Sequence, residues 1–168
     1  MKYILLTAVM LASATLANAQ ENFFPKDTAE HCLALNIYYE ARSSNLADQI
    51  AVSDVVINRV NSTRYPNTVC EVVRQGLTKP SWKDPNKMVM VRNKCQFSWY
   101  CDGKKDIPNN NDAWKSAQYV AYQMIHLEKF IGITEGATHY HATYVNPKWA
   151  QDMILIGRIG SHIFYRDN

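Results

Sequence analysis

A glutamate at the end of an apolar helical stripe is the residue of this sequence best suited to chemistry. In residues 32–43, Leu33 and Ile37 recur at the four-residue spacing of one helix face, and Glu40 follows three residues later on that face. Burial among apolar groups disfavours a charged carboxylate, so we expect the pKa of Glu40 to be raised. A carboxyl group that stays protonated can act as a general acid, for instance on a glycosidic oxygen. The alternative is a helix-end glutamate that pairs with Arg42 or points into water.

The spacing of His139 and His141 suggests a second kind of site, a metal centre. Side chains two apart on a strand share one face, so this pair could chelate a cation together with His162. The sequence has no His-Glu-x-x-His motif, and no acidic third ligand lies near the pair. We therefore expect histidines that line a groove or pack, and a protein that needs no metal or other cofactor.

Nucleophilic catalysis by serine or cysteine has little support. A Gly-x-Ser-x-Gly elbow is absent from the sequence, and paired cysteines would leave no free thiol. A glycosidase can use a second carboxylate, for which Asp48, Asp54, Glu71 and Asp102 are available, but none has an equally suggestive setting. Without a partner, one glutamate would protonate the leaving oxygen and then remove a proton from a hydroxyl of the same sugar, which closes on itself without consuming water.

Helices in the first half of the chain must position Glu40. Asp27 and Glu30 have capping-box spacing and predict the start of the first helix. A second, centrally buried helix is expected over residues 46–60, which carry apolar residues on one face and three further valines. A short helix that stops at Gly76 and a long helix that begins after residues 109–112 complete this half.

The later part of the chain changes to a strand pattern. Residues 77–94 contain two prolines and several lysines and are expected to form an exposed loop, while residues 95–99 suit a strand or extended segment. Residues 137–145 alternate with period two, and residues 159–166 are their expected antiparallel partner. Helices followed by a small antiparallel sheet in the C-terminal third predict an α+β fold.

The N-terminus has the features of a cleaved signal peptide. In residues 1–19 a positive Lys2 precedes an apolar run too short to span a bilayer comfortably, and Ala17-Asn18-Ala19 is a small-x-small cleavage site. The mature chain is then expected to be a single domain over residues 20–168, periplasmic or secreted, with no stable membrane insertion.

All four cysteines lie in the part expected to be exported, and their even number predicts two disulfides. Three pairings are open. We favour Cys95 with Cys101, which close a short loop, and Cys32 with Cys70. A zinc site is the alternative, but the spacings are irregular and contain no Cys-x-x-Cys knuckle.

The charge and aromatic content restrict the class of partner. A formal net charge of +3 is too small to argue for nucleic acid, although it suits an anionic wall polymer. Ten tyrosines and four tryptophans offer flat faces for stacking on sugars, although most aromatic residues simply pack cores.

Several motifs in a fixed order carry a resemblance to a known family. They occupy residues 34–42 (ALNIYYEAR), 49–52 (QIAV), 56–60 (VINRV), 65–70 (YPNTVC), 95–99 (CQFSW), 137–141 (ATHYH), 147–149 (PKW) and 159–165 (IGSHIFY). Over about residues 31–166 the chain resembles the cell wall hydrolases typified by the spore cortex-lytic enzymes. Residues 43–45 (SSN) stand where a Gly-Glu pair often follows the Glu-Ala-Arg motif. We expect no counterpart of the separate N-terminal peptidoglycan-binding domain of the spore enzymes.

This resemblance implies a lysozyme-like domain that cleaves the glycan strands of peptidoglycan as a lytic transglycosylase, leaving 1,6-anhydromuramic ends. It implies that Glu40 is the catalytic residue. Residues of the glycan groove map onto Gln96, Ser98, His139, Tyr140 and His141. A monomer is expected. A muramidase or glucosaminidase that uses water is one alternative, and a non-catalytic wall-binding or inhibitor module is the other, although a binding module has no need of a desolvated acid.

Overall fold

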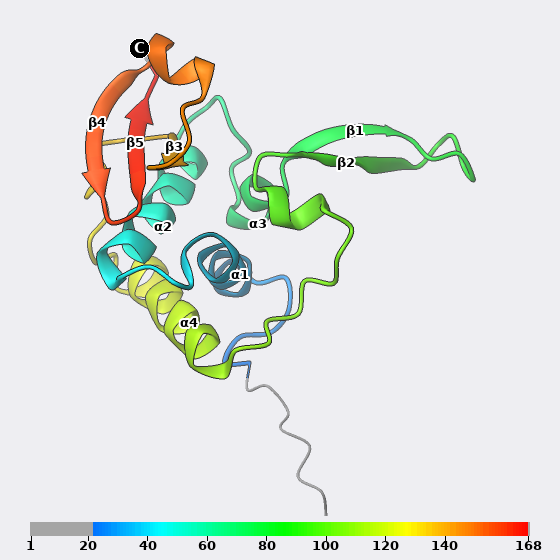
Figure 1. Cartoon of the computed structure of the whole chain (residues 1–168). Coiled ribbons are helices and arrows are strands. Elements are labelled where there is room, and N and C mark those ends of the chain that lie inside the picture. Colours follow the sequence, from blue (N-terminus) through cyan, green and yellow to red (C-terminus); the bar gives the residue numbers. More distant parts are fainter. Residues whose placement is uncertain (1–21, 168) are drawn as a thin grey trace, which may run out of the picture.

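The computed structural model describes residues 22–167, so the expected signal peptide lies outside the described residues and stays a prediction. The elements are α1 (Ala29–Ala41), α2 (Leu46–Val60), α3 (Val69–Val73), β1 (Gly76–Pro80), β2 (Met88–Cys95), the 3₁₀ helix η1 (Ser98–Cys101), α4 (Asn111–His126), β3 (His139–Ala142), the 3₁₀ helix η2 (Lys148–Asp152), β4 (Ile154–Ile159) and β5 (His162–Arg166). Helices followed by a small antiparallel sheet confirm the α+β prediction (Figure 1).

Helix α1 is enclosed by the other helices and forms the centre of the larger core (Figure 1). Leu33, Ile37 and Tyr38 are fully buried there, and Trp114 of α4 packs against them. The start of α1 differs from the prediction, because Thr28 caps the helix by accepting a hydrogen bond from the His31 amide. Asp27 instead has a positive φ and forms an ion pair with Arg74.

Helix α2 has the predicted bounds and lies between two apolar clusters. Its Ile50 and Val56 belong to the larger core, while Val52 and Val55 pack under the C-terminal sheet with Phe164. The side chain of Asn45 caps the helix by accepting a hydrogen bond from the Asp48 amide. Helix α2 therefore fixes the sheet relative to α1.

The C-terminal sheet has the order β3-β5-β4 and is antiparallel throughout. The expected pairing of the two late segments is confirmed by β3 and β5, in which Tyr140 lies opposite Phe164. The prediction lacked β4, which joins the sheet through a tight turn at Gly160, where φ is +57°.

Residues 77–94 are not the loop predicted from their prolines and lysines. Strands β1 and β2 form an antiparallel hairpin that extends away from the helices (Figure 1). The prolines lie where a strand tolerates them, since Pro80 ends β1 and Pro85 lies in the turn. Gly76 begins β1 and does not stop α3, which already ends at Val73. Glycine suits this position because a Cβ there would lie 2.8 Å from the Cys95 sulfur.

Two disulfides hold the helical half together. Cys32 of α1 is bonded to Cys70 of α3, and Cys95 at the end of β2 is bonded to Cys101 of η1. This is the pairing that the cysteine spacing favours.

Residues 95–99 are extended only in part, since a 3₁₀ helix begins at Ser98. Within residues 22–167, no helix has both the length and the apolar character needed to cross a bilayer.

Candidate active site

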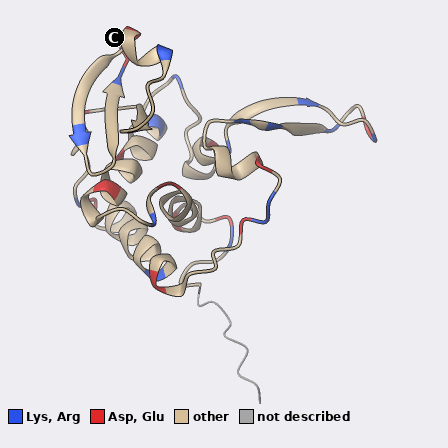
Figure 2. Ribbon diagram, viewed as in Figure 1, with Lys and Arg blue, Asp and Glu red and all other residues tan. Residues whose placement is uncertain are grey.

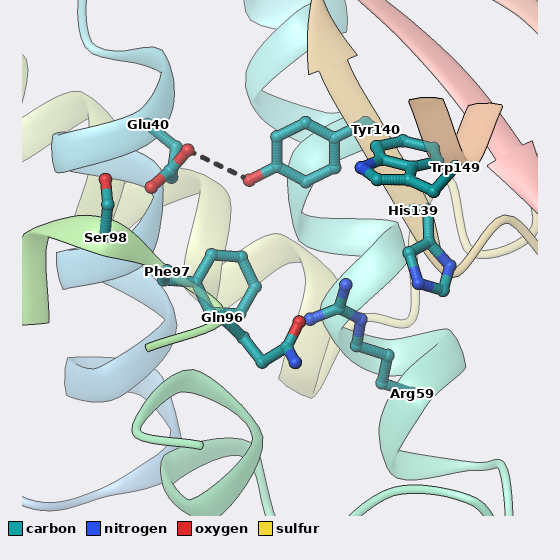
Figure 3. A pocket seen from close by; sticks show the side chains of 8 residues that line it. All are labelled: Glu40, Arg59, Gln96, Phe97, Ser98, His139, Tyr140 and Trp149. Carbon is teal, nitrogen blue, oxygen red and sulfur yellow. Dashed lines mark hydrogen bonds between the residues drawn. The ribbon is translucent and has the colours of Figure 1, made fainter. Parts of the chain in front are cut away.

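Glu40 lies in the last turn of α1, where the helix leaves the core. Its side chain is partly buried and reaches a cavity of about 230 Å³ between the helices and the C-terminal sheet (Figure 3). The cavity is lined by Glu40, Arg59, Gln96, Phe97, Ser98, His139, Tyr140 and Trp149. Among these residues Glu40 is the single carboxylate.

The surroundings of Glu40 favour its protonated form. Burial raises the pKa of Glu40, and this effect outweighs the hydrogen bond from Tyr140 and the positive charges of His162 and Arg59, which act in the opposite direction. The C-terminal end of α1 also carries the negative end of the helix dipole. A glutamate in this setting can hold a proton where an ordinary surface glutamate is ionised.

Tyr140 connects the sheet to Glu40. Its hydroxyl donates a hydrogen bond of 3.3 Å to Glu40 Oε2 (Figure 3), and its ring packs against Phe164 and His162. Burial, together with the nearby charge of Glu40, raises the pKa of Tyr140 well above its usual range. Tyr140 therefore stays a hydrogen-bond donor to the carboxyl group.

The two neighbouring histidines of β3 have different positions. His139 lines the cavity, with its ring 5.4 Å from that of Trp149. His141 is not among the lining residues; its Nε2 lies 3.0 Å from the Tyr165 hydroxyl and its ring stacks on that of Tyr165. The ring centroid of Trp149 is 5.7 Å from that of His141, so His141 contacts this cavity residue without lining the cavity itself.

Gln96 and Ser98 form the opposite wall of the cavity and are both exposed. The Gln96 amide donates to the Gln75 carbonyl, and the adjacent Cys95–Cys101 disulfide closes the segment into a loop. Trp99 joins this loop to α1, since its indole N–H donates to Asn36 Oδ1 and its ring stacks on Tyr39. The wall is thus fixed relative to Glu40.

Arg59 is a cavity residue that the sequence reasoning did not single out. It is 5% exposed, its Nε donates to the Thr138 carbonyl at 2.7 Å, and its guanidinium lies over the rings of Tyr65 and Phe97. In the part of the chain that the structure describes, its Nη1 has no hydrogen-bond partner. The signal was available, because Arg59 follows Val52 and Val55 at helical spacing on a buried face.

Trp149 and Phe97 were likewise absent from the predicted site. Trp149 comes from η2, far along the chain from α1, and lies beside His139 (Figure 3). Phe97 is buried beneath the guanidinium of Arg59. Trp149 belongs to the motif at residues 147–149, but that motif by itself does not predict its contact with His139 of β3.

The other carboxylates proposed as partners of Glu40 have different roles. Asp48 accepts hydrogen bonds from the Ser161 amide and hydroxyl and lies 2.8 Å from His162 Nδ1. Burial opposes its ionisation, but these hydrogen bonds prevail and lower the pKa of Asp48 to about 2. Asp54 accepts from the amides of Gly132 and Thr134 and from the Thr134 hydroxyl.

Glu71 and Asp102 also lie outside the cavity. Glu71 accepts a hydrogen bond from the Thr68 hydroxyl at the start of α3, and Asp102 forms an ion pair with Lys104. None of the four carboxylates therefore lines the cavity with Glu40. Over residues 22–167 no three histidine, cysteine, aspartate or glutamate side chains are grouped so that they could hold a metal ion.

Comparison with known proteins identifies the family. A profile of the cell wall hydrolases matches residues 43–165. The chain belongs to the cell wall hydrolase family. This confirms the resemblance seen in the motifs and the expectation that the protein is a wall-degrading enzyme. The matched region begins at Ser43, so Glu40 lies just before it.

Two solved structures are similar to this cell wall hydrolase. A crystal structure of the catalytic domain of the Bacillus cereus SleB protein is 25% identical, with a TM-score of 0.56, and the match covers 82% of this chain and 89% of that one. The catalytic domain of the germination-specific lytic transglycosylase SleB from Bacillus anthracis is 24% identical, with a TM-score of 0.58 and coverage of 87% and 99%. No curated protein matches the chain.

Proposed function

We propose that this cell wall hydrolase cleaves the glycan strands of peptidoglycan with Glu40 as its single catalytic acid and base, and that it releases 1,6-anhydromuramic ends. The observation that carries the proposal is a glutamate with a raised pKa as the one carboxylate among the residues that line the cavity. The similarity to SleB catalytic domains, one of them titled a lytic transglycosylase, supports the same reaction class.

The reaction follows from the two protonation states of Glu40. The protonated carboxyl donates its proton to the oxygen between muramic acid and the next sugar as the C1–O bond breaks. The resulting carboxylate then accepts the proton of the C6 hydroxyl of the same muramic residue, and O6 bonds to C1. Glu40 regains its proton, and the sugar is closed into a 1,6-anhydro ring.

The surrounding residues suit both halves of this cycle. The Tyr140 hydroxyl and the positive charge of Arg59 stabilise the carboxylate formed midway, while burial restores the protonated form at the end. We propose Gln96, Ser98 and His139 as hydrogen-bonding groups for the sugars and Trp149 as a flat face beside them. His141 acts through Trp149 and Tyr165 in this proposal.

Hydrolysis is the alternative reaction, and it ordinarily uses a second carboxylate, either as the base that activates water or as the nucleophile. No second carboxylate lines the described cavity, which favours attack by the substrate's own hydroxyl. We also propose that the enzyme acts outside the cytoplasm, which the two disulfides and the expected signal peptide support, and that it is a monomeric catalytic domain over residues 20–168.

Mass spectrometry of digested sacculi tests the proposal. We expect anhydromuramic ends from the native enzyme and none from Glu40→Gln, which keeps the shape of the side chain without its proton. Reducing muramic or glucosamine ends would replace the transglycosylase by a hydrolase. Digestion by Glu40→Gln at nearly the native rate would overturn the role of Glu40 altogether.

A further inference from the structure

The β1–β2 hairpin has a composition unlike that of the rest of the molecule. Residues 76–95 contain five basic residues and one acidic residue, a net charge of +4, whereas the whole chain has +3. The basic residues are Lys79, Lys83, Lys87, Arg92 and Lys94, and all five are exposed. Figure 2 shows this positive charge along the hairpin, away from the helical core. The net positive charge of the chain is thus concentrated on one projecting element, the β1–β2 hairpin.

An exposed tryptophan lies in the turn of this hairpin. Trp82 is 88% exposed, and the Lys83 ammonium lies 5.3 Å from its ring centroid. The turn is ordered, because the Ser81 amide donates to the Lys87 carbonyl at 2.7 Å and the Lys87 amide donates to the Asp84 carbonyl. A large aromatic face held in water beside cations suits a ligand with flat sugar faces and anionic groups.

The base of the hairpin is fixed beside the cavity. Cys95 at the end of β2 is bonded to Cys101, and Arg92 Nε donates to the Asp102 carbonyl. Gln96 and Ser98, which line the cavity, follow β2 directly. At the usual rise per strand residue, the turn lies about 20 Å from this base. A polymer that occupies the cavity is long enough to meet the hairpin as well.

We propose that the β1–β2 hairpin is a second binding surface for peptidoglycan, with Trp82 stacking on a sugar ring and the lysines pairing with stem-peptide carboxylates of the intact wall. The inference rests on the proposed function, since the occupant is the substrate polymer. Charge complementarity favours this polymer, whose peptides carry carboxylates, and continuity with the cavity wall places the surface beside the substrate. The hairpin would hold the enzyme on the sacculus between cleavage events.

Binding to purified sacculi in the Glu40→Gln background tests this surface without cleavage. We expect Trp82→Ala, and separately Lys83→Ala with Lys87→Ala, to weaken binding about tenfold, the scale of a central aromatic or charged contact. Trp82→Phe should restore much of the aromatic effect. Matched controls are Tyr119→Ala, which removes an exposed aromatic on α4, and Lys26→Ala with Lys129→Ala, which removes two exposed charges elsewhere; both should leave binding unchanged.

Turnover separates the hairpin from the catalytic cavity. With Glu40 intact, the hairpin variants should cleave a short soluble peptidoglycan fragment at the native rate but digest sacculi more slowly. Unchanged sacculus binding in both hairpin variants would overturn the proposal. Loss of binding to phosphatidylglycerol vesicles with sacculus binding retained would overturn it in favour of a membrane surface. Failure of the proposed function would appear differently, as digestion of sacculi by Glu40→Gln.

Discussion

Glu40 and Asp48 are two partly or fully buried carboxylates on consecutive helices, and the structure shifts their pKa values in opposite directions. Glu40 lies at the C-terminal end of α1 and accepts one hydrogen bond of 3.3 Å, so burial prevails and its pKa is raised. Asp48 lies in the first turn of α2, where the helix dipole favours an anion, and two Ser161 donors and His162 surround it. Its pKa is lowered to about 2.

The comparison shows how the proposed catalytic acid, Glu40, differs from a carboxylate with a structural role. Exposed surface area alone does not distinguish them, because Asp48 is the less exposed of the two. The number of donors around the carboxylate decides the outcome. The ionised form of Asp48 stabilises the fold, whereas the ionisation of Glu40 costs folding free energy at neutral pH. Four experiments sharpen or break this contrast.

The largest effect is expected from Glu40→Gln. Turnover on sacculi should fall at least ~10²-fold, because the variant cannot donate or accept the proton. Its thermal stability should be higher than that of the native protein at pH 7, since the raised pKa of Glu40 makes ionisation unfavourable to folding. This stability difference should shrink as the pH falls below the ordinary glutamate value of 4.5, because Glu40 then becomes protonated in both states. Lower stability of the variant at pH 7 would contradict the sign of the pKa shift.

Asp48→Asn should have the opposite profile. The amide loses the charge that three donors face, so the free energy of unfolding should fall by about 2–4 kcal/mol in chemical denaturation. The folded fraction should keep its turnover, because Asp48 does not line the cavity. Ser161→Ala is the matched smaller change and should cost about 1 kcal/mol through the loss of one hydroxyl donor.

Acid titration measures the same network in the native protein. The pKa of Asp48 is about 2 in the fold against an ordinary value of 3.8, so its ionisation contributes about 2 kcal/mol of stability that is complete above pH ~4. This contribution should be lost as the pH falls from ~4 through ~2. The native protein should therefore lose stability in this window more steeply than Asp48→Asn does. Parallel curves for the two proteins would contradict the lowered pKa.

Tyr140→Phe should lower turnover much less than Glu40→Gln does. Its hydroxyl stabilises the Glu40 carboxylate, so removing it should raise the pKa of Glu40 further. The alkaline limb of the pH–activity profile should then move to higher pH, with a loss of maximal rate smaller than that of Glu40→Gln. A shift of this limb to lower pH would show that Tyr140 does not act on the carboxylate.

Much of the fold follows from local sequence signals. The bounds of α2 are predictable because Asn45 provides a cap and the apolar stripe ends at Val60. The predicted inner face of α4 is equally regular: Trp114, Ala117, Ala121 and Met124 are buried, and Ile125 of the same stripe is partly buried. The hairpin was mistaken for a loop because its prolines suggested irregular structure, whereas the pairing of β1 with β2 depends on contacts between strands.

The candidate site likewise combines a residue that local sequence signals predict with residues that only tertiary contacts bring together. Glu40 is recognisable from its place on an apolar helix face, since helical spacing is a local property. The sequence could not show that hydrogen bonds from Ser161 and His162, which are more than one hundred residues away along the chain, keep Asp48 ionised. Nor could it bring Arg59 and Trp149 to the same cavity as Glu40. Local spacing determined which carboxylate lies at the edge of the core, whereas tertiary packing decided its donors and therefore its protonation.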